Sequence, residues 1–167
     1  DIYQKAFNKG AIITKEIDQY FCEETQIFLA DRYIKGTCPK CQAEDQYGDA
    51  CEVCYATYDA TDLIDPVSEF SKKAPVLKSS THYFFDLQKF EKVVQKWLAT
   101  DPVQPEVKNK LKEWFDQGLK PWDISRDAPY FGFQIPGTTD KYFYVWMDAP
   151  VGYIATTKNW CEAFQLD

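Results

Sequence analysis

The sequence is poor in the residues that most often carry acid–base chemistry: its 167 residues include one histidine, His82, and one methionine. Without a second histidine, neither a nucleophilic triad nor a histidine-based metal catalyst has support. A lone histidine in a strand-like run is more often structural than a ligand or a base, and we interpret His82 in that way. No apolar run approaches the roughly 18–20 residues of a membrane span, so we expect no membrane partner.

Basic residues are also in short supply, because 19 Lys and Arg face 26 Asp and Glu, a net charge of −7. This balance argues against a free-standing binder of nucleic acid, DNA included, since phosphate recognition needs a basic face. The chain opens on Asp1 without an initiator methionine or a secretory signal, and its composition is typical of a cytoplasmic protein. We expect it to be a piece of a longer polypeptide.

Aromatic residues, in contrast, make up 17% of the chain, enough for a folded core. The residue pattern predicts an α/β fold, or α+β for the segment in isolation. In chain order we expect a helix over 3–12 closed by Gly10, short antiparallel strands at 12–14, 20–22 and 27–29 around a turn at 23–24, and a strand at 76–85.

Two helices with apolar stripes should follow that strand. The first has Asp86 as a candidate N-cap and is broken by Asp101-Pro102, and the second has Pro105 in its first turn and Gly118 at its end. We interpret both stripes as core packing: Leu87, Phe90, Val93, Val94, Trp97 and Leu98 in the first helix, and Val107, Leu111, Trp114 and Phe115 in the second.

The C-terminal part predicts a return to sheet structure. We expect a strand at 130–135, a turn at 136–140, and a central strand at 141–147 that is covered on both faces. A helix with Asp148 near its N-cap and Pro150 in its first turn should follow. No internal repeat is expected.

Four of the six cysteines form two Cys-x2-Cys pairs, Cys38 with Cys41 and Cys51 with Cys54, separated by nine residues. Each pair can place two sulfurs on one side of a tight turn, and two such turns complete the tetrahedral shell that Zn²⁺ prefers. Because all four ligands would come from the protein, the single zinc ion per chain should be structural rather than catalytic. Two disulfides or an iron–sulfur centre are the alternatives, while Cys22 and Cys161 are interpreted as ordinary buried thiols.

The surroundings of this cluster carry a resemblance. Residues 28–41 (FLADRYIKGTCPKC), 45–54 (DQYGDACEVC), 122–133 (WDISRDAPYFGF) and 142–153 (YFYVWMDAPVGY) closely resemble blocks of the methionyl-tRNA synthetases, bacterial type, in the same order. One departure is Tyr55, which follows the fourth cysteine where a small residue, often Gly, is expected. This change could alter the turn while leaving all four ligands in place.

The resemblance implies a class I aminoacyl-tRNA synthetase, whose Rossmann-like catalytic domain is interrupted by a zinc-bearing insertion. Such an enzyme activates methionine with ATP and Mg, then esterifies the 3′ end of tRNA(Met). The His-Ile-Gly-His and Lys-Met-Ser-Lys-Ser signatures that hold ATP phosphates do not occur in these residues, so we expect the chain alone to be inactive.

Carried over by position, Trp146 matches the wall beside the methionine side chain, Ala149, Pro150 and Tyr153 match neighbouring pocket positions, and Arg126 matches the active-site arginine. A thioether can be recognised only through its shape, apolar contacts and contacts between its polarisable sulfur and aromatic rings. An indole and a phenol can provide such contacts. The structural alternatives are core aromatics and, for Arg126, a surface salt bridge.

The implied organisation has four parts. Residues 1–35 lead into the insertion and contain its β part, 36–58 form the zinc knuckle, 59–120 complete the insertion with two helices, and 121–167 begin the second half of the catalytic domain. Two other hypotheses stay open: a stand-alone zinc module that binds RNA or protein, and a related synthetase for leucine, isoleucine or valine.

Overall fold

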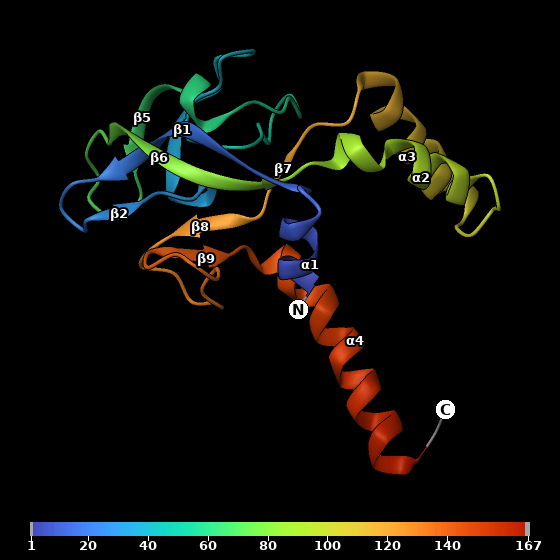
Figure 1. Ribbon diagram of the computed structural model, residues 1–167. Coiled ribbons are helices and arrows are strands. Elements are labelled where there is room, and N and C mark those ends of the chain that lie inside the picture. Colours follow the sequence, from blue (N-terminus) through green and yellow to red (C-terminus); the bar gives the residue numbers. More distant parts are fainter. Residues whose placement is uncertain (1, 166–167) are drawn as a thin grey trace. The chain divides into compact units, whose positions relative to one another are not determined.

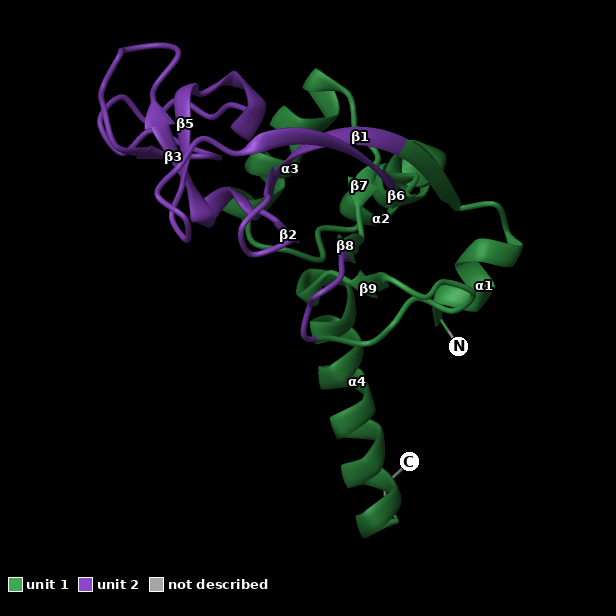
Figure 2. Cartoon of the chain, turned by 90° about the vertical axis from the view of Figure 1, so that its left-hand side faces the viewer, with its two compact units in different colours: residues 1–15, 82–126, 132–167 green, residues 16–81, 127–131 purple. Residues whose placement is uncertain are grey.

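The computed structural model describes residues 2–165, and its internal contacts divide the chain into two compact units (Figure 2). Unit 1 contains residues 1–15, 82–126 and 132–167, and unit 2 contains residues 16–81 and 127–131. Each unit combines helical turns and strands, which confirms the mixed α/β content. The four-part division of the sequence remains a prediction. Over the described residues, no helix is both long and apolar enough to cross a bilayer.

Unit 2 is built on short antiparallel strands. The end of β1 (Ile12–Cys22) pairs with β2 (Ile27–Phe28), which confirms the hairpin expected around residues 23–24. The two strands expected at 12–14 and 20–22 are one continuous strand, because the polar residues between them keep the extended conformation. A three-stranded sheet has the order β4-β3-β5, with β3 at Ile34–Thr37, β4 at Gln46–Tyr47 and β5 at Ile64–Ser68.

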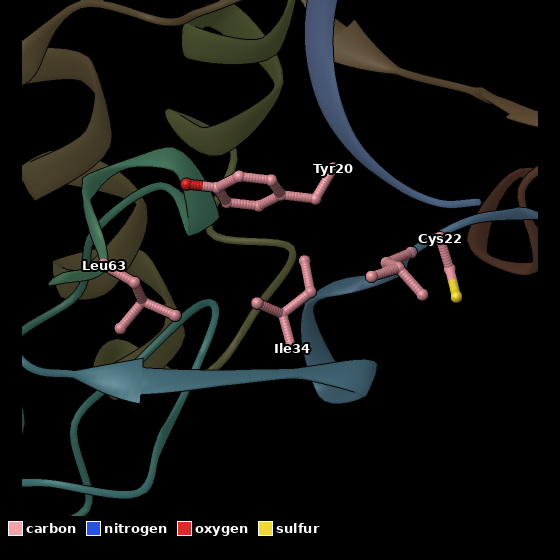
Figure 3. Close-up of a cluster of buried hydrophobic side chains, with 5 residues drawn as sticks. Tyr20, Cys22, Ile34 and Leu63 are labelled. Atoms are coloured by element: carbon pink, nitrogen blue, oxygen red, sulfur yellow. The ribbon is translucent and has the colours of Figure 1, made fainter. Parts of the chain in front are cut away.

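The core of unit 2 is a small cluster of buried side chains. Ile34 lies between Leu63 and Cys22, with the Tyr20 ring above it (Figure 3). Gly36 allows β3 to approach this framework, since a Cβ at that position would lie 2.8 Å from the Ile64 carbonyl oxygen. The 3₁₀ turns η1 (Asp31–Tyr33) and η2 (Ala60–Asp62) connect the strands.

Unit 1 begins with α1 (Ile2–Asn8), which ends as expected at Gly10 in the left-handed conformation (φ 64°). Strand β6 (Val76–Phe85), which enters from unit 2, has the predicted bounds, and its end pairs antiparallel with β7 (Trp122–Asp123). The short strands β8 (Ser125–Asp127) and β9 (Lys141–Phe143) form a two-stranded sheet. The core contains Tyr3, Ile12, Ile124 and Ile135.

The two helices after β6 are present, and three of their four expected ends are confirmed. The N-cap expected at Asp86 is wrong, because a 3₁₀ turn intervenes and Phe90 is the N-cap of the first helix. A 3₁₀ turn η3 (Leu87–Phe90) follows Asp86 and continues into α2 (Glu91–Leu98), whereas α3 (Pro105–Gln117) begins at Pro105 and ends before Gly118. Their expected role in a core is wrong for this structure, because only Leu98 of the two stripes is fully buried. Val93, Trp97, Val107 and Trp114 are exposed, since no described element packs over them.

The expected central strand at 141–147 is also wrong. The strand ends at Phe143, and α4 (Val145–Phe164) begins directly after Tyr144 and runs toward the C-terminus as one continuous helix (Figure 1). Pro150 lies inside this helix rather than in its first turn, and Tyr144 rather than Asp148 is its N-cap. Without neighbouring strands among the described residues to pair residues 144–147, a helix satisfies their backbone hydrogen bonds locally.

The strand expected at 130–135 is a single antiparallel bridge between Gln134 and Tyr142. Residues 128–133 contain no strand, and Phe131 and Phe133 are exposed. The turn that follows is present, because Ile135 N–H donates to the Lys141 carbonyl at 2.9 Å.

Candidate functional site

The four-cysteine cluster is formed by two copies of one six-residue turn. In the first knuckle turn (residues 38–43), Cys38 N–H donates to the Ala43 carbonyl at 2.9 Å, and Gln42 N–H donates to the Cys38 carbonyl at 3.0 Å. The Cys38 sulfur accepts hydrogen bonds from the N–H groups of Lys40 (3.3 Å) and Cys41 (3.5 Å). The backbone therefore holds the first sulfur in place.

The second knuckle turn (residues 51–56) repeats this pattern. Cys51 N–H donates to Ala56 and Tyr55 N–H to Cys51, both at 2.9 Å, and the Cys51 sulfur accepts from the N–H groups of Val53 and Cys54, both at 3.4 Å. The prediction that each Cys-x2-Cys pair forms a tight turn is confirmed.

The two turns bring all four sulfur atoms within 4.8 Å of one another. The Cys38–Cys54 and Cys41–Cys51 sulfur separations are 3.9 and 3.6 Å. A tetrahedral ion with Zn–S bonds near 2.3 Å requires sulfur separations of about 3.8 Å. The cysteines are all free thiols, so the disulfide alternative is not what the structure contains. The cluster could therefore hold a zinc ion without rearrangement.

The electrostatics of the cluster suit a divalent cation. Burial raises the pKa of the Cys38 thiol, but hydrogen bonds from the Cys41 and Lys40 N–H groups outweigh burial and bring that pKa down to about 6. For Cys41 the hydrogen bond from the Ala43 backbone favours the thiolate, but burial and the neighbouring sulfurs raise the pKa to about 12. A bound cation would offset this repulsion among thiolates. Burial and nearby thiolates likewise raise the pKa of Tyr58 to about 12.

Unit 2 contains a third copy of the turn that the sequence did not predict. In the third knuckle turn (residues 68–73), Ser68 N–H donates to Lys73 and Lys72 N–H to Ser68, both at 2.9 Å. The Ser68 hydroxyl accepts from the N–H groups of Phe70 and Ser71, as the cysteine sulfurs do.

Residues 22–27 form a fourth knuckle turn, where Thr25 hydrogen-bonds to Cys22 through both its hydroxyl and its backbone. Residue five of every turn has a left-handed backbone: Gln26, Gln42, Tyr55 and Lys72 have φ of 55°, 62°, 59° and 56°. The turn therefore recurs in the structure without a repeat in the sequence, because serine and threonine stand where three further cysteines would have marked it.

Cys22 lies at the centre of this hydroxyl-lined pair of turns. Hydrogen bonds from Thr25, and then from the Ser71 and Ser68 hydroxyls, oppose burial and lower the pKa of the Cys22 thiol to about 6. The buried position expected for Cys22 is confirmed, but its surroundings are polar on one side. Cys161 lies half-buried on α4.

Arg126, in unit 1, is held from several sides. Its guanidinium carbon lies 3.8 Å from the centroid of the Tyr144 ring, and its Nη1 donates to the Ser125 carbonyl at 2.6 Å. The Asp123 carboxylate is 3.4 Å from the same nitrogen. The guanidinium is thus partly buried and oriented by neighbours of its own unit.

Asp123 also connects this arginine to the lone histidine. His82 is almost fully buried, and its Nδ1 lies 2.7 Å from Asp123 Oδ2. The other oxygen, Oδ1, accepts from the Ser125 hydroxyl and backbone at 3.0 Å. His82 therefore has a structural role, as expected, but its partner Asp123 could not be identified from the sequence.

The four expected substrate residues share one face of α4, because Trp146, Ala149, Pro150 and Tyr153 have the spacing i, i+3, i+4 and i+7. The structure therefore brings them together, although on a helix and not at the end of a strand. Trp146 is 65% exposed and Tyr153 is 78% exposed, so neither is a core aromatic among the described residues.

Comparison with known proteins places these features in a family. The model for class I tRNA synthetases (M) matches residues 1–167. Methionine–tRNA ligase of Francisella tularensis subsp. tularensis (strain WY96-3418) is 60% identical over 164 residues, which is 97% of this chain and 24% of that protein. The Psychrobacter arcticus enzyme is 59% identical over 166 residues, 96% of this chain and 24% of its own length.

Solved structures agree with this match at the level of the fold. Apo methionyl-tRNA synthetase of Mycobacterium tuberculosis aligns with a TM-score of 0.53 at 18% identity over 92% of this chain and 27% of its own. A complex of the same synthetase with methionyl-adenylate also gives 0.53, at 16% identity over 92% of this chain and 26% of its own. The chain spans about a quarter of the length of the curated relatives it matches. It belongs to the class I tRNA synthetase family, in the methionine–tRNA ligase group.

Proposed function

We propose that this chain is a segment of a methionine–tRNA ligase that activates methionine with ATP and Mg and transfers it to the 3′ end of tRNA(Met). Within such an enzyme the segment supplies a structural zinc site and part of the methionine pocket. The observation that carries the proposal is the coincidence of close family membership with one exposed helix face that presents Trp146, Ala149, Pro150 and Tyr153. Two large aromatics exposed on one face are costly to leave in water, and a ligand or a covering segment would bury them.

The proposed methionine contact follows from the chemistry of the side chains. A thioether has no charge and no strong donor, so selectivity must come from apolar fit and sulfur–aromatic contact. Trp146 and Tyr153 offer an indole and a phenol two helical turns apart, with small Ala149 and rigid Pro150 between them. Small residues between two rings leave room for an unbranched side chain.

Arg126 is the proposed active-site residue. Its guanidinium is oriented by the Tyr144 ring and the Ser125 carbonyl. A guanidinium held in this way can bind an anionic group or a carboxylate without first losing side-chain freedom. The zinc ion, bound by Cys38, Cys41, Cys51 and Cys54, would cross-link two turns of unit 2 and has no open position for a substrate.

The test is methionine-dependent exchange of pyrophosphate into ATP by the complete polypeptide that contains these residues. Exchange driven by methionine, and not by leucine or isoleucine, is expected. Trp146→Ala should raise the methionine concentration needed for half-maximal exchange at least 10-fold, since an aromatic contact of about 1.4 kcal/mol is lost. Trp160→Ala is the matched control, because Trp160 is an exposed tryptophan of the same helix that lies four turns away.

Either of two results would overturn the proposal. An absence of exchange from the folded, zinc-loaded polypeptide would favour the stand-alone zinc module instead. Equal effects of the two tryptophan substitutions would remove Trp146 from the methionine pocket. We expect the 167-residue chain alone to give no exchange under the assay conditions in which the complete enzyme is active.

A further inference from the structure

The knuckle turns differ from one another at their second residue. In the first turn this residue is Pro39, which has no backbone N–H. In the third turn it is Glu69, whose N–H donates to the Tyr33 carbonyl at 2.8 Å. In the second turn it is Glu52, whose N–H donates to the side-chain Oε1 of Gln46 at 2.7 Å. In the second and third turns, the structure therefore supplies an acceptor for the N–H at this position.

Gln46 differs from Tyr33 as an acceptor, because Gln46 accepts through its side chain and Tyr33 through its backbone carbonyl. It lies on β4 and is 7% exposed, and its Nε2 donates to the Glu44 carbonyl at 2.7 Å. The pairing of Gln46 with Gly36 fixes β4 against β3, the strand that leads directly into Cys38. The Gln46 backbone is thus paired with the strand before the first knuckle turn, while its side-chain amide binds the backbone of the second.

The Gln46 amide meets both requirements without adding charge. Its nitrogen donates to a carbonyl while its oxygen accepts from an N–H, and it adds no charge beside four sulfurs. A carboxylate would keep the acceptor but would lose the donor and repel thiolates, and a thioether would leave both backbone groups unsatisfied in a buried position.

We propose that Gln46 is a positioning residue for the metal centre, which sets the separation of the two cysteine turns and so holds the four sulfurs at tetrahedral spacing. The inference depends on the cluster binding a divalent ion and not on the proposed enzymatic activity. Partners that orient metal ligands without touching the ion typically contribute 10- to 100-fold to metal retention. Gln46 reaches the second turn next to Cys51, so its loss acts on two of the four ligands.

The test measures zinc release to a chromogenic chelator from the complete polypeptide that contains these residues, together with the visible absorption of its Co²⁺-loaded form. Gln46→Met should release zinc about 10-fold faster and weaken the tetrahedral Co²⁺ bands. Gln88→Met is the control, because Gln88 is an exposed glutamine in a 3₁₀ turn of unit 1, whereas the cluster belongs to unit 2. A substitution that only lowered overall stability would not change the Co²⁺ spectrum of the folded, metal-bound chain.

A second pair of variants tests the Glu52 N–H directly. Glu52→Pro places in the second turn the residue type that Pro39 provides in the first, and it removes the residue 52 N–H. Glu52→Ala keeps that N–H. In the Glu52→Pro background, Gln46→Met should speed zinc release by less than 3-fold, but in the Glu52→Ala background the full 10-fold effect should remain.

Three outcomes would overturn the inference: release from Gln46→Met at the control rate, equal effects in both Glu52 backgrounds, or failure of the unsubstituted chain to bind either metal. If Gln46→Met does not fold, Gln46→Glu decides the matter. That variant keeps an acceptor for Glu52 and should give an intermediate release rate, whereas release at the rate of the unsubstituted chain contradicts the proposal.

Discussion

Tyr55 stores backbone strain that a glycine would release. Its φ of 59° lies in the left-handed region, and its side chain is 84% exposed. That conformation costs a residue with a Cβ about 1–2 kcal/mol of free energy, whereas glycine adopts it without a steric penalty. Glycine loses more freedom on folding, roughly 0.5–1 kcal/mol, so the net gain from Tyr55→Gly is about 0.5–1 kcal/mol. The exposed ring contributes little burial, and the hydrogen bond from the residue 55 N–H to Cys51 is kept.

The assay is urea unfolding of the zinc-loaded chain. Tyr55→Gly should raise the free energy of unfolding by about 0.5–1 kcal/mol, and Gln42→Gly, at the equivalent place in the first knuckle turn, should do the same. Val53→Gly is the matched control. Val53 is exposed in the same turn without a positive φ, so its replacement should lower stability by about 0.5–1 kcal/mol. If Tyr55→Gly destabilises the chain as much as Val53→Gly, the strain argument is refuted.

Two further predictions concern Arg126 and Cys22. Tyr144→Leu removes the ring 3.8 Å from the Arg126 guanidinium, a contact worth about 0.5–2 kcal/mol, so kcat/KM for pyrophosphate exchange by the complete polypeptide should fall roughly 2- to 30-fold. Tyr144→Phe should stay near the unsubstituted rate, and equal losses would contradict this. The pKa of Cys22 is lowered to about 6 from an ordinary value of 9, so its contribution to stability is complete above pH 9 and is lost as the pH falls through 6. The free energy of unfolding of Cys22→Ala, measured in urea, should therefore rise less between pH 6 and 9 than that of a Cys161→Ala control. Parallel curves of this free energy against pH would argue against a buried thiolate.

The sequence predicted the elements whose signals are local. Gly10 ends α1, Pro105 begins α3 and the alternation of residues 76–85 defines β6, because each depends on the conformational limits of a few adjacent residues. The cysteine spacing predicted two tight turns for the same reason. The geometry of these turns is encoded in at most six consecutive residues.

The errors arose where the outcome depends on distant partners. Residues 144–147 have the composition of a buried strand, but without neighbouring strands among the described residues they form the start of α4. The stripes of α2 and α3 are apolar, yet Trp97 and Trp114 stay exposed because nothing described covers them. The partnership of Asp123 with His82 joins residues 41 positions apart, and no pattern within either segment indicates it.

The third and fourth knuckle turns were missed for a different reason. Their backbone matches that of the cysteine turns, but Ser68, Ser71 and Thr25 replace the residues that would reveal it. A search for a positive φ four residues after a hydrogen-bond acceptor needs a structure, because Gln26, Gln42, Tyr55 and Lys72 share no side-chain type.

This repetition makes the response of unit 2 to chemical stress unequal. Oxidants attack sulfur and chelators remove a bound metal ion, and between them the first and second knuckle turns expose Cys41 and Cys54. The third turn is closed by serine hydroxyls, which neither reagent attacks, and Cys22 is shielded by burial. Loss of metal or oxidation of thiols would therefore begin at residues 38–56, while the turn of the same hydrogen-bond pattern at residues 68–73 would stay closed.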